Sequence, residues 1–341
     1  MGKNIKTSIG GQALIEGIMM RGPKKTALAV RNPQGEMVIE CSDTPAGNSK
    51  VAKIPFIRGI VNLVSSLKLG YKYLMRSAEI SGLEEAEAEL AKEKEEKRRA
   101  KAEKKGKEYK EKEKSDEKSG LSTVIMLISS LLGVAIAVSL FIFLPTFVST
   151  LILGKNASQD YPVWVAVISG VIKVLVLIGY MASVSLMKDI RRTFMYHGAE
   201  HKTIFCYERG KELTVENVKK ERRYHPRCGT SFIFLMVFVG VIVMIPIGLL
   251  LRLLPAEILE NRLLYTLIRT GVAILLVPFM AGGGYELIRL AGRHENVCTK
   301  VISAPGMWLQ RITTREPDDD MIECAIAALK EVIPEDGSDK L

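Results

Sequence analysis

The chain has 341 residues, a net charge of +10 at pH 7, 48% hydrophobic residues and only 6% aromatic residues. The hydrophobic residues are concentrated in four long, nearly charge-free runs that alternate with strongly charged segments. This distribution excludes an ordinary soluble enzyme and predicts an α-helical polytopic membrane protein with four transmembrane helices. The basic N-terminus has no apolar run behind it, so we expect no cleaved secretory signal.

Residues 1–52 are predicted to form a small cytoplasmic β-rich module. Short apolar segments at 27–30 and 37–39 flank the sequence Asn-Pro-Gln-Gly, which predicts two strands around a turn. The preceding segment, IGGQALIEGIMMRGP, is rich in glycine, but its spacing differs from that of a phosphate-binding loop.

Residues 53–82 are predicted to form a basic amphipathic helix. Apolar residues such as Ile57, Val64 and Leu67 recur at helical spacing, with lysines and arginines between them. Such a helix either lies on a membrane surface or packs on the β-rich module, and the sequence favours the two alternatives equally.

Residues 83–119 are predicted to form a charged tether. The stretch from 84 to 118 contains thirteen acidic and thirteen basic residues, so its net charge is zero. Alternating Glu and Lys favour a solvated helix or a disordered linker. The balance of charge argues against strong nucleic-acid affinity, and we expect no sequence-specific nucleic-acid binding.

Residues 120–290 are predicted to form a four-helix membrane domain. A helix needs about 20 residues to cross the hydrocarbon core of a bilayer, and each apolar run is at least that long. Pro145 lies in the first and longest run, which predicts a tilt or break there. The four runs are residues 121–153, 162–187, 231–254 and 263–285.

The distribution of basic residues predicts the orientation of this domain. Residues 1–83 carry a net charge of +7 and residues 188–230 carry +5, whereas the loops at 154–161 and 255–262 are short and nearly neutral. Lysine and arginine are enriched in cytoplasmic loops. The two short loops should therefore face outward, and both termini of this multi-pass protein should lie on the cytoplasmic side of the cell membrane.

Residues 291–341 are predicted to be a cytoplasmic segment that contains an amphipathic helix. The sequence SAPGMWLQ predicts a turn that brings Trp308 near the membrane interface. The acidic residues that follow it suit the start of a helix, where the helix dipole is positive. The predicted apolar stripe of this helix consists of Met321, Ile322, Ala325, Ile326 and Leu329.

The charged segment 188–230, predicted to be a cytoplasmic loop between the second and third spans, contains the pattern H-x-x-E-H. On a helix, His197 and His201 share one face because they are four residues apart, and Glu200 lies beside them. Two imidazoles can bind a divalent metal, and the carboxylate can act as the general base on a metal-bound water. This order of residues is that of the inverted zinc peptidases.

His225 and Cys228 supply a second candidate pair of ligands just before the third apolar run. Zinc accepts both nitrogen and thiolate ligands, so either residue could complete the site. His294, Glu295 and Glu286 are further candidates on the same side of the membrane. Alternatively, the histidines only hydrogen-bond to the backbone or to lipid headgroups, the cysteine is a packing residue, or four protein ligands close a purely structural site.

Two cations lie within the predicted spans. Lys173 is in the middle of the second run, and Arg269 is near the start of the fourth. An ionisable group at such a depth is expected to face the interior of the bundle and to have a partner. No acidic residue lies at a matching depth, so backbone carbonyls, water or another subunit would have to serve.

Four sequence blocks together resemble the YqhQ family, a bacterial, mainly Gram-positive membrane family with relatives in plants and an unknown function. The resemblance covers nearly the whole chain and is weakest in the charged stretch at 84–118. Members are often described as metal-dependent enzymes, which implies a site including His197, Glu200, His201, His225 and Cys228. The blocks are IGGQALIEGIMMRGP, YHGAEHKTI, RYHPRCGTSF and SAPGMWLQRITTREPDDDMIECAIAAL.

Two functions follow from these features as alternatives. The first is a membrane-embedded, metal-dependent enzyme, a hydrolase of peptides or lipids at the cytoplasmic interface, with zinc as the expected cofactor and Glu200 as the general base. The second is a non-enzymatic adaptor of a membrane machine such as protein translocation or insertion. Its basic cytoplasmic surfaces would contact anionic lipid, a ribosome or acidic proteins. The sequence does not specify an oligomeric state.

Overall fold

A computed structural model describes residues 5–44, 54–83, 118–154, 156–293 and 296–340. The predicted tether therefore lies almost wholly outside the described residues, as do the candidate ligands His294 and Glu295.

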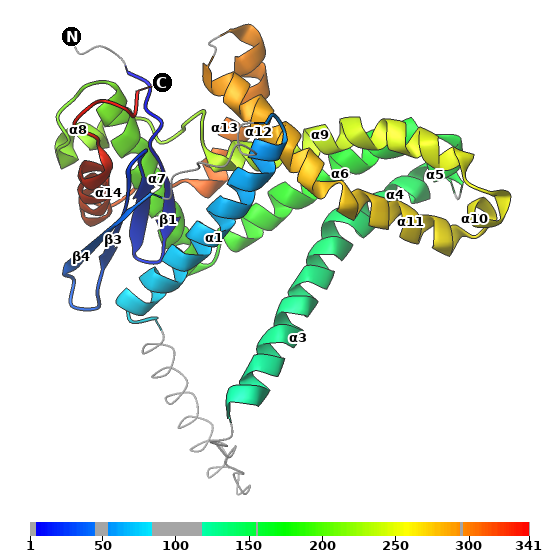
Figure 1. Cartoon of the computed structure of the whole chain (residues 1–341), viewed down its shortest axis with the longest axis horizontal. Helices are drawn as coiled ribbons and strands as arrows, with labels where there is room; N and C mark the ends of the chain where they lie inside the picture. The colour runs from blue at the N-terminus through cyan, green and yellow to red at the C-terminus, as the bar shows by residue number, and fades with distance from the viewer. Residues whose placement is uncertain (1–4, 45–53, 84–117, 155, 294–295, 341) are drawn as a thin grey trace, which may run out of the picture.

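The N-terminal module is a four-stranded antiparallel sheet in which each strand pairs with the next one along the chain (Figure 1). The two predicted strands are confirmed as β3 and β4, but the two strands formed by the glycine-rich segment were not predicted. The strands are β1 (Gly10–Leu14), β2 (Gly17–Arg21), β3 (Lys25–Arg31) and β4 (Met37–Asp43).

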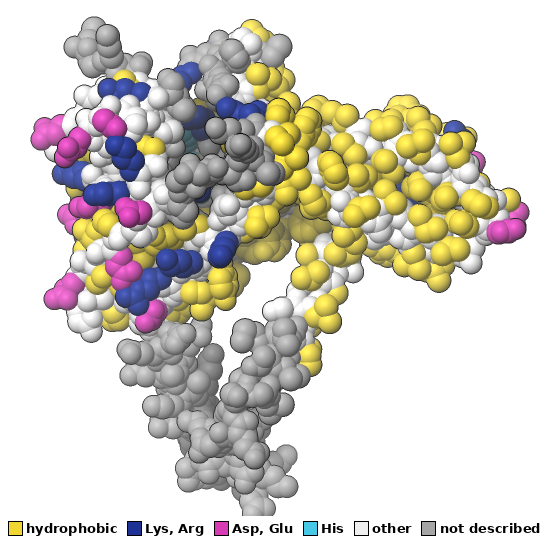
Figure 2. Space-filling model, viewed as in Figure 1, with side chains coloured by type: hydrophobic (Ala, Val, Ile, Leu, Met, Phe, Trp, Pro, Cys, Tyr) yellow, Lys and Arg dark blue, Asp and Glu magenta, His cyan; other side chains and the backbone are white. Residues whose placement is uncertain are grey.

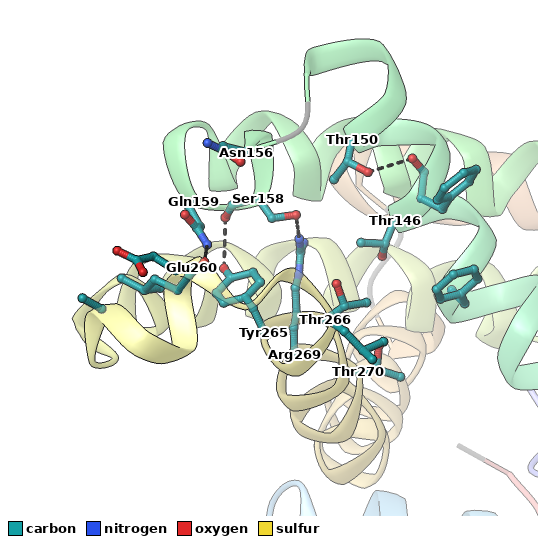
Figure 3. Close-up of a pocket in the computed structure, with 15 residues that line it drawn as sticks. Thr146, Thr150, Asn156, Ser158, Gln159, Glu260, Tyr265, Thr266, Arg269 and Thr270 are labelled. Atoms are coloured by element: carbon teal, nitrogen blue, oxygen red, sulfur yellow. Dashed lines mark hydrogen bonds between the residues drawn. The ribbon is translucent and has the colours of Figure 1, made fainter.

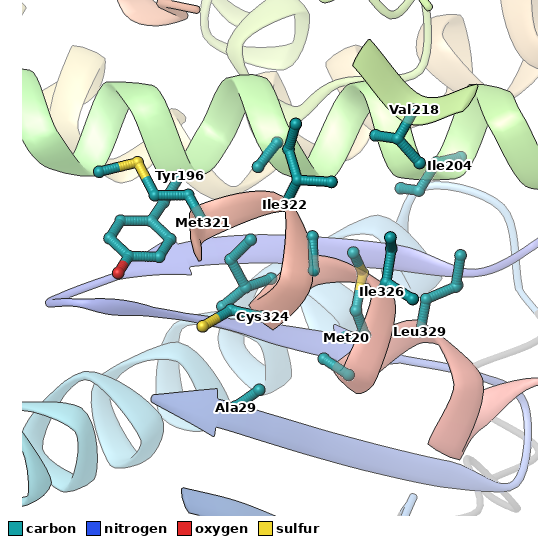
Figure 4. Close-up of a cluster of buried hydrophobic side chains, with 14 of the residues drawn as sticks. Met20, Ala29, Tyr196, Ile204, Val218, Met321, Ile322, Cys324, Ile326 and Leu329 are labelled. Atoms are coloured by element: carbon teal, nitrogen blue, oxygen red, sulfur yellow. The ribbon is translucent and has the colours of Figure 1, made fainter. Parts of the chain in front are cut away.

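Helices pack on both faces of the sheet, and alternate side chains of each strand point to opposite faces. Ile18 and Met20 of β2 face a core formed with the helices α7 (Lys188–Glu208) and α14 (Asp319–Val332) (Figure 4). Met19 faces the other side, where Tyr73 of α1 (Ile57–Ile80) is buried. The sheet is thus the middle layer of three.

The predicted amphipathic helix is confirmed as α1. Of the two predicted placements, the structure shows packing: the C-terminal half of α1 covers the sheet, and Gly59 near its start contacts Gly282 of α12 (Val277–Arg293). Val64, Leu67 and Tyr71 remain exposed on its outer face.

The C-terminal segment contains two helices rather than a turn and one helix. The predicted amphipathic helix is confirmed as α14, and all five residues of its predicted apolar stripe are buried. The predicted turn at SAPGMWLQ is wrong, because these residues lie inside α13 (Val297–Thr313). Gly306 serves a close crossing instead: a Cβ atom there would overlap Ser231 of α9 (Gly229–Leu250).

Among the residues that the structure describes, three helical segments are long and apolar enough to cross a membrane: Ile128–Leu153, Pro162–Val184 and Gly229–Leu253. The fourth predicted span is a pair of helices, Leu263–Leu275 and Val277–Leu290, bent by 43° relative to each other. Pro278 explains the break, since it cannot donate a hydrogen bond to the preceding helical turn. The described residues therefore contain three continuous candidate spans, or four if the bent pair is counted as one.

The apolar helices are joined by short elements. Pro145 follows a π-helical turn, but the helical segment continues from Ile128 to Leu153, so the local irregularity is not a break. The elements of this region are α3 (Lys118–Val138), η2 (Ser139–Phe143), α4 (Leu144–Leu153), α5 (Ala157–Asp160), α6 (Pro162–Val184), η3 (Leu251–Leu253), α10 (Ala256–Glu260) and α11 (Arg262–Leu275).

The molecule is elongated, with the sheet at one end and α5 and α10 at the other (Figure 1). Hydrophobic side chains cover the helical end, whereas charged side chains gather over the sheet end (Figure 2). Residues 188–230 are not an open loop but contain α7 and α8 (Val215–Lys219), which pack into the core beside the sheet. The predicted β-rich module, this segment and the C-terminal helix α14 therefore form one body.

Candidate metal centre

The H-x-x-E-H pattern lies on α7, as predicted, and places both histidines on one face of that helix. The rings of His197 and His201 are 4.4 Å apart between centroids. Gly198 lets this helix pack closely against the chain after α13, because a Cβ atom at that position would overlap the Arg315 carbonyl. The Phe194 carbonyl accepts a hydrogen bond of 2.8 Å from the Arg315 amide at the same crossing.

Cys228 approaches the two histidines from the N-cap position of α9. Its Sγ atom is 3.2 Å from His197 Nε2. One ligand atom from each of His197, His201 and Cys228 lies within 4.8 Å of the other two. Around a tetrahedral zinc ion, ligand atoms are roughly 3.5 Å apart, as follows from its bond lengths of about 2.0–2.3 Å. The three groups therefore need only small movements to bind one ion.

The tautomers of the two histidines suit metal binding. His197 Nδ1 is 2.8 Å from the Thr313 carbonyl oxygen, and His201 Nδ1 is 2.6 Å from that of Arg223. A carbonyl oxygen can only accept, so each Nδ1 atom carries the proton and each Nε2 atom keeps its lone pair. His201 Nε2 is buried without a hydrogen-bond partner. Zinc sites in proteins have donors and outer hydrogen bonds of this kind.

His225 lies beside this group rather than in it. Its ring centroid is 5.7 Å from that of His201, and its Nε2 atom is 3.6 Å from a carboxylate oxygen of Glu208. The Arg227 amide donates to its Nδ1 atom over 3.3 Å, which places the imidazole proton on Nε2, facing Glu208. Gln310 holds the backbone of His225 through two hydrogen bonds. Cys228 therefore lies closer than His225 to the two histidines of α7.

Glu200 is buried and accepts a hydrogen bond of 3.1 Å from the amide of Gly11 on β1. Its other carboxylate oxygen has no hydrogen-bond partner. Burial raises the pKa of Glu200 to about 7, although the nearby His197 and the Gly11 amide favour its charged form. A carboxyl group with such a pKa is suited to proton transfer near neutral pH.

Burial also affects the pKa values of His201 and Cys228, two of the three candidate ligands. It lowers the pKa of His201, and the neighbouring His197 acts in the same direction, so the neutral imidazole is favoured. Burial alone would raise the pKa of the Cys228 thiol, but His201 and hydrogen bonds from Thr230 outweigh it and lower that pKa. Neutral imidazole and thiolate are the forms that bind metals.

Several groups that build the site were not predicted from the sequence. Gly11 is one, because a Cβ atom there would lie 2.9 Å from Glu200 Cδ. The fully buried Gln310 and the carbonyls of Thr313 and Arg223 are others. The glycine pair in the first sequence block was a visible signal for a close approach, whereas main-chain acceptors leave no signal in a sequence.

Glu286, a further predicted candidate, serves a different purpose. It forms an ion pair with Arg58 and accepts a hydrogen bond of 3.3 Å from the amide of Phe56. These contacts join the start of α1 to α12.

Comparisons with known proteins identify the same family as the four sequence blocks. The family model described as "Protein of unknown function (DUF1385)" matches residues 54–335. The chain is 31% identical over 338 residues to "Uncharacterized protein YqhQ" of Bacillus subtilis (strain 168), which covers 96% of this chain and 93% of the relative. No solved structure matches the chain. The chain therefore belongs to the DUF1385 family, and the predicted resemblance to YqhQ is confirmed.

Proposed function

We propose that the chain is a multi-pass membrane protein with a zinc-dependent hydrolase site where the sheet module meets the third span. One observation carries this proposal: two histidine Nε2 atoms with free lone pairs and one cysteine Sγ atom converge at a point. Three protein ligands leave a fourth position for water, which is the arrangement of catalytic zinc sites. When bound, zinc would supply a nucleophilic water near neutral pH.

Each residue of the chain then has a role. His197, His201 and Cys228 would hold the metal, and the carbonyls of Thr313 and Arg223 would keep the imidazoles in the required tautomer. Glu200 would accept a proton from the bound water, because it follows His197 by less than one helical turn and has a free carboxylate oxygen. The substrate would be a peptide or a lipid at the cytoplasmic membrane surface.

The burial of the site favours a second candidate, an adaptor whose zinc is structural. His201 is 1% exposed, Glu200 5% and Cys228 8%, so a substrate could reach the metal only after an opening movement. His225, at 5% exposure, lies close enough to become a fourth protein ligand if its ring rotates away from Glu208. Such a closed site would only join α7 to α9.

Cobalt substitution tests both candidates without a known substrate. Purified protein loaded with Co²⁺ should show a thiolate-to-cobalt absorption band, which Cys228→Ser should abolish. Cys206→Ser is the matched control, because Cys206 is another buried cysteine, on α7, outside the ligand group. His201→Ala should remove the metal, whereas Glu200→Gln should retain it. Metal content that is unchanged in His201→Ala would refute the site.

The fourth coordination position separates the enzyme from the adaptor. Azide added to the cobalt protein should shift the ligand-field bands if water occupies that position, because azide replaces it. Bands that do not respond to azide in the wild type, but do respond in His225→Ala, would identify His225 as the fourth ligand. That result would favour the structural zinc site and the adaptor.

A further inference from the structure

Two adjoining cavities lie among the apolar helices: the first is at the end of the molecule remote from the sheet, and the second extends from it along α6 and α9. The first has a volume of about 800 Å³ and is bordered by α4, α5, α10 and α11 (Figure 3). The second has a volume of about 390 Å³ and a mainly apolar lining, most of it from α6, α9, α11 and α12. Three residues, Thr146, Arg269 and Thr270, line both cavities, so the two meet there.

Arg269 extends into the first cavity and is only 5% exposed (Figure 3). It donates one hydrogen bond, of 2.8 Å, to the Ser158 hydroxyl. Among the described residues it forms no ion pair, and the nearest acidic side chain of the cavity lining, Glu260, lies at the rim beyond Tyr265 (Figure 3). The guanidinium group therefore has donors that no anion of the described chain satisfies.

Lys173 brings a second positive charge to the same place from α6. It lines the second cavity together with Arg269, and no ion pair or hydrogen bond of its amine is found within the described parts of the chain. A partner for Lys173 was expected because it lies in the middle of an apolar run, and none of the described residues supplies one. Two cations in a low-dielectric region are costly unless an anion accompanies them.

The apolar second cavity indicates what kind of molecule carries that anion. Its lining includes Leu177, Met236 and Met244, which would suit a hydrocarbon chain but would add nothing to the binding of a free inorganic ion. The cavities also lie in the region whose outer surface is covered by exposed hydrophobic side chains (Figure 2). A molecule that combines an anion with a hydrocarbon chain is already present in the surrounding bilayer.

We propose that these cavities bind an anionic phospholipid, with its phosphate at the junction between Arg269 and Lys173 and an acyl chain in the apolar cavity. A phosphate accepts two parallel hydrogen bonds from a guanidinium group, and the lysine amine adds a charge from the other side. This site is independent of the metal centre, which lies at the sheet end of the molecule.

Thermal unfolding of the full-length protein in zwitterionic detergent tests the proposal. Added short-chain phosphatidic acid should raise the unfolding temperature, since a ligand stabilises the state that it binds. Phosphatidylcholine of the same chain length and inorganic phosphate are the comparison probes. An equal effect of phosphatidylcholine would overturn the requirement for an anion, and an equal effect of inorganic phosphate would overturn the choice of a lipid.

Variants locate the binding site. Arg269→Gln should weaken the apparent affinity for phosphatidic acid at least about tenfold, because a charge-assisted hydrogen bond is lost. Arg252→Gln is the matched control, since Arg252 is exposed at the same end, bonds to the Asp160 carbonyl and lines neither cavity. Thr270→Leu keeps both cations but fills the junction, and it should also weaken binding. Unchanged affinity in either Arg269→Gln or Thr270→Leu would overturn the proposal.

Discussion

At the scale of single residues, the main-chain carbonyls of Thr313 and Arg223 decide what the two histidines of α7 can do. They accept hydrogen bonds from the Nδ1 atoms of His197 and His201, so both Nε2 atoms keep their lone pairs. These lone pairs are directed toward Cys228 or the centre of the group. Since the acceptors are backbone atoms, no side-chain substitution removes them directly. The ligand geometry therefore depends on the position of the chain segments that carry them.

A substitution at Gly11 tests whether strand β1 approaches Glu200 closely. In Gly11→Ala the new methyl group would lie 2.9 Å from Glu200 Cδ, from the Met19 carbonyl oxygen and from Met20 Sδ. Overpacking of this kind destabilises a protein by about 1–3 kcal/mol, so the unfolding temperature should fall. Circular dichroism of the purified variant measures the change.

Gly10→Ala is the control for this prediction. Gly10 also lies on β1, but a Cβ atom there would meet nothing within 4 Å. The expected change in the free energy of unfolding is within about 0.5 kcal/mol. If both variants unfold at the wild-type temperature, the close approach of β1 to Glu200 is not present in the molecule.

The candidate site could be predicted from the sequence only in part. Spacing of four residues on a helix brings His197 and His201 together, and this needs no knowledge of the rest of the chain. That Cys228 joins them, while His225 turns toward Glu208, depends on how α9 and α13 pack. Packing between segments far apart in the sequence has no local pattern, so the sequence left this choice open.

At the scale of elements, glycines allow α1 to cross α12 closely. A Cβ atom on Gly59 would lie 2.8 Å from Gly282 Cα and 2.9 Å from Tyr285 Cβ. Gly59→Ala should therefore separate the two helices and lower the free energy of unfolding by about 1–3 kcal/mol. Unfolding followed by circular dichroism in detergent measures this loss.

Gly179→Ala provides the comparison for that crossing. Gly179 lies on an exposed part of α6, where a Cβ atom would meet nothing within 4 Å. Its replacement should leave the free energy of unfolding unchanged or raise it by up to about 1 kcal/mol, because alanine has a higher helix propensity than glycine. An equal loss of stability in the two variants would show that the close crossing of α1 and α12 does not determine the effect.

The elements that the sequence predicted well are those with a regular apolar period. The helices α1 and α14 have one, and both were found where they were predicted. The Pro-Gly pair in α13 suggested a turn, although Gly306 serves a helix crossing. The strands β1 and β2 were not predicted, because their glycines interrupt the pattern of side chains. These glycines occupy positions where Glu200 and the neighbouring strand β3 leave no room for a side chain.

At the scale of the whole molecule, the sheet module is assembled from three separated parts of the chain. Strands β1–β4, helix α7 and helix α14 share one core, while the apolar helices extend from it in one direction (Figure 1). In this arrangement α5 and α10, which lie within the two short and nearly neutral loops, are together at the end remote from the sheet (Figure 1). The shape of the molecule thus agrees with the prediction that both short loops lie on one side of the membrane, and the charge distribution supports the proposal that this side is the outer one.

Cysteine labelling in intact cells tests this orientation. A cysteine at the exposed position Glu257, on α10, should react with a membrane-impermeant maleimide added outside, because α10 is proposed to face outward. A cysteine at the equally exposed Glu216, on α8, should react only after the cells are permeabilised. Cys41, which is exposed whereas Cys206, Cys228 and Cys324 are buried, is replaced by Ser in both variants, and that background alone is the control for the remaining cysteines. Labelling of the Glu216 position from outside, with protection of the Glu257 position, would reverse the orientation and place the metal centre on the outer face.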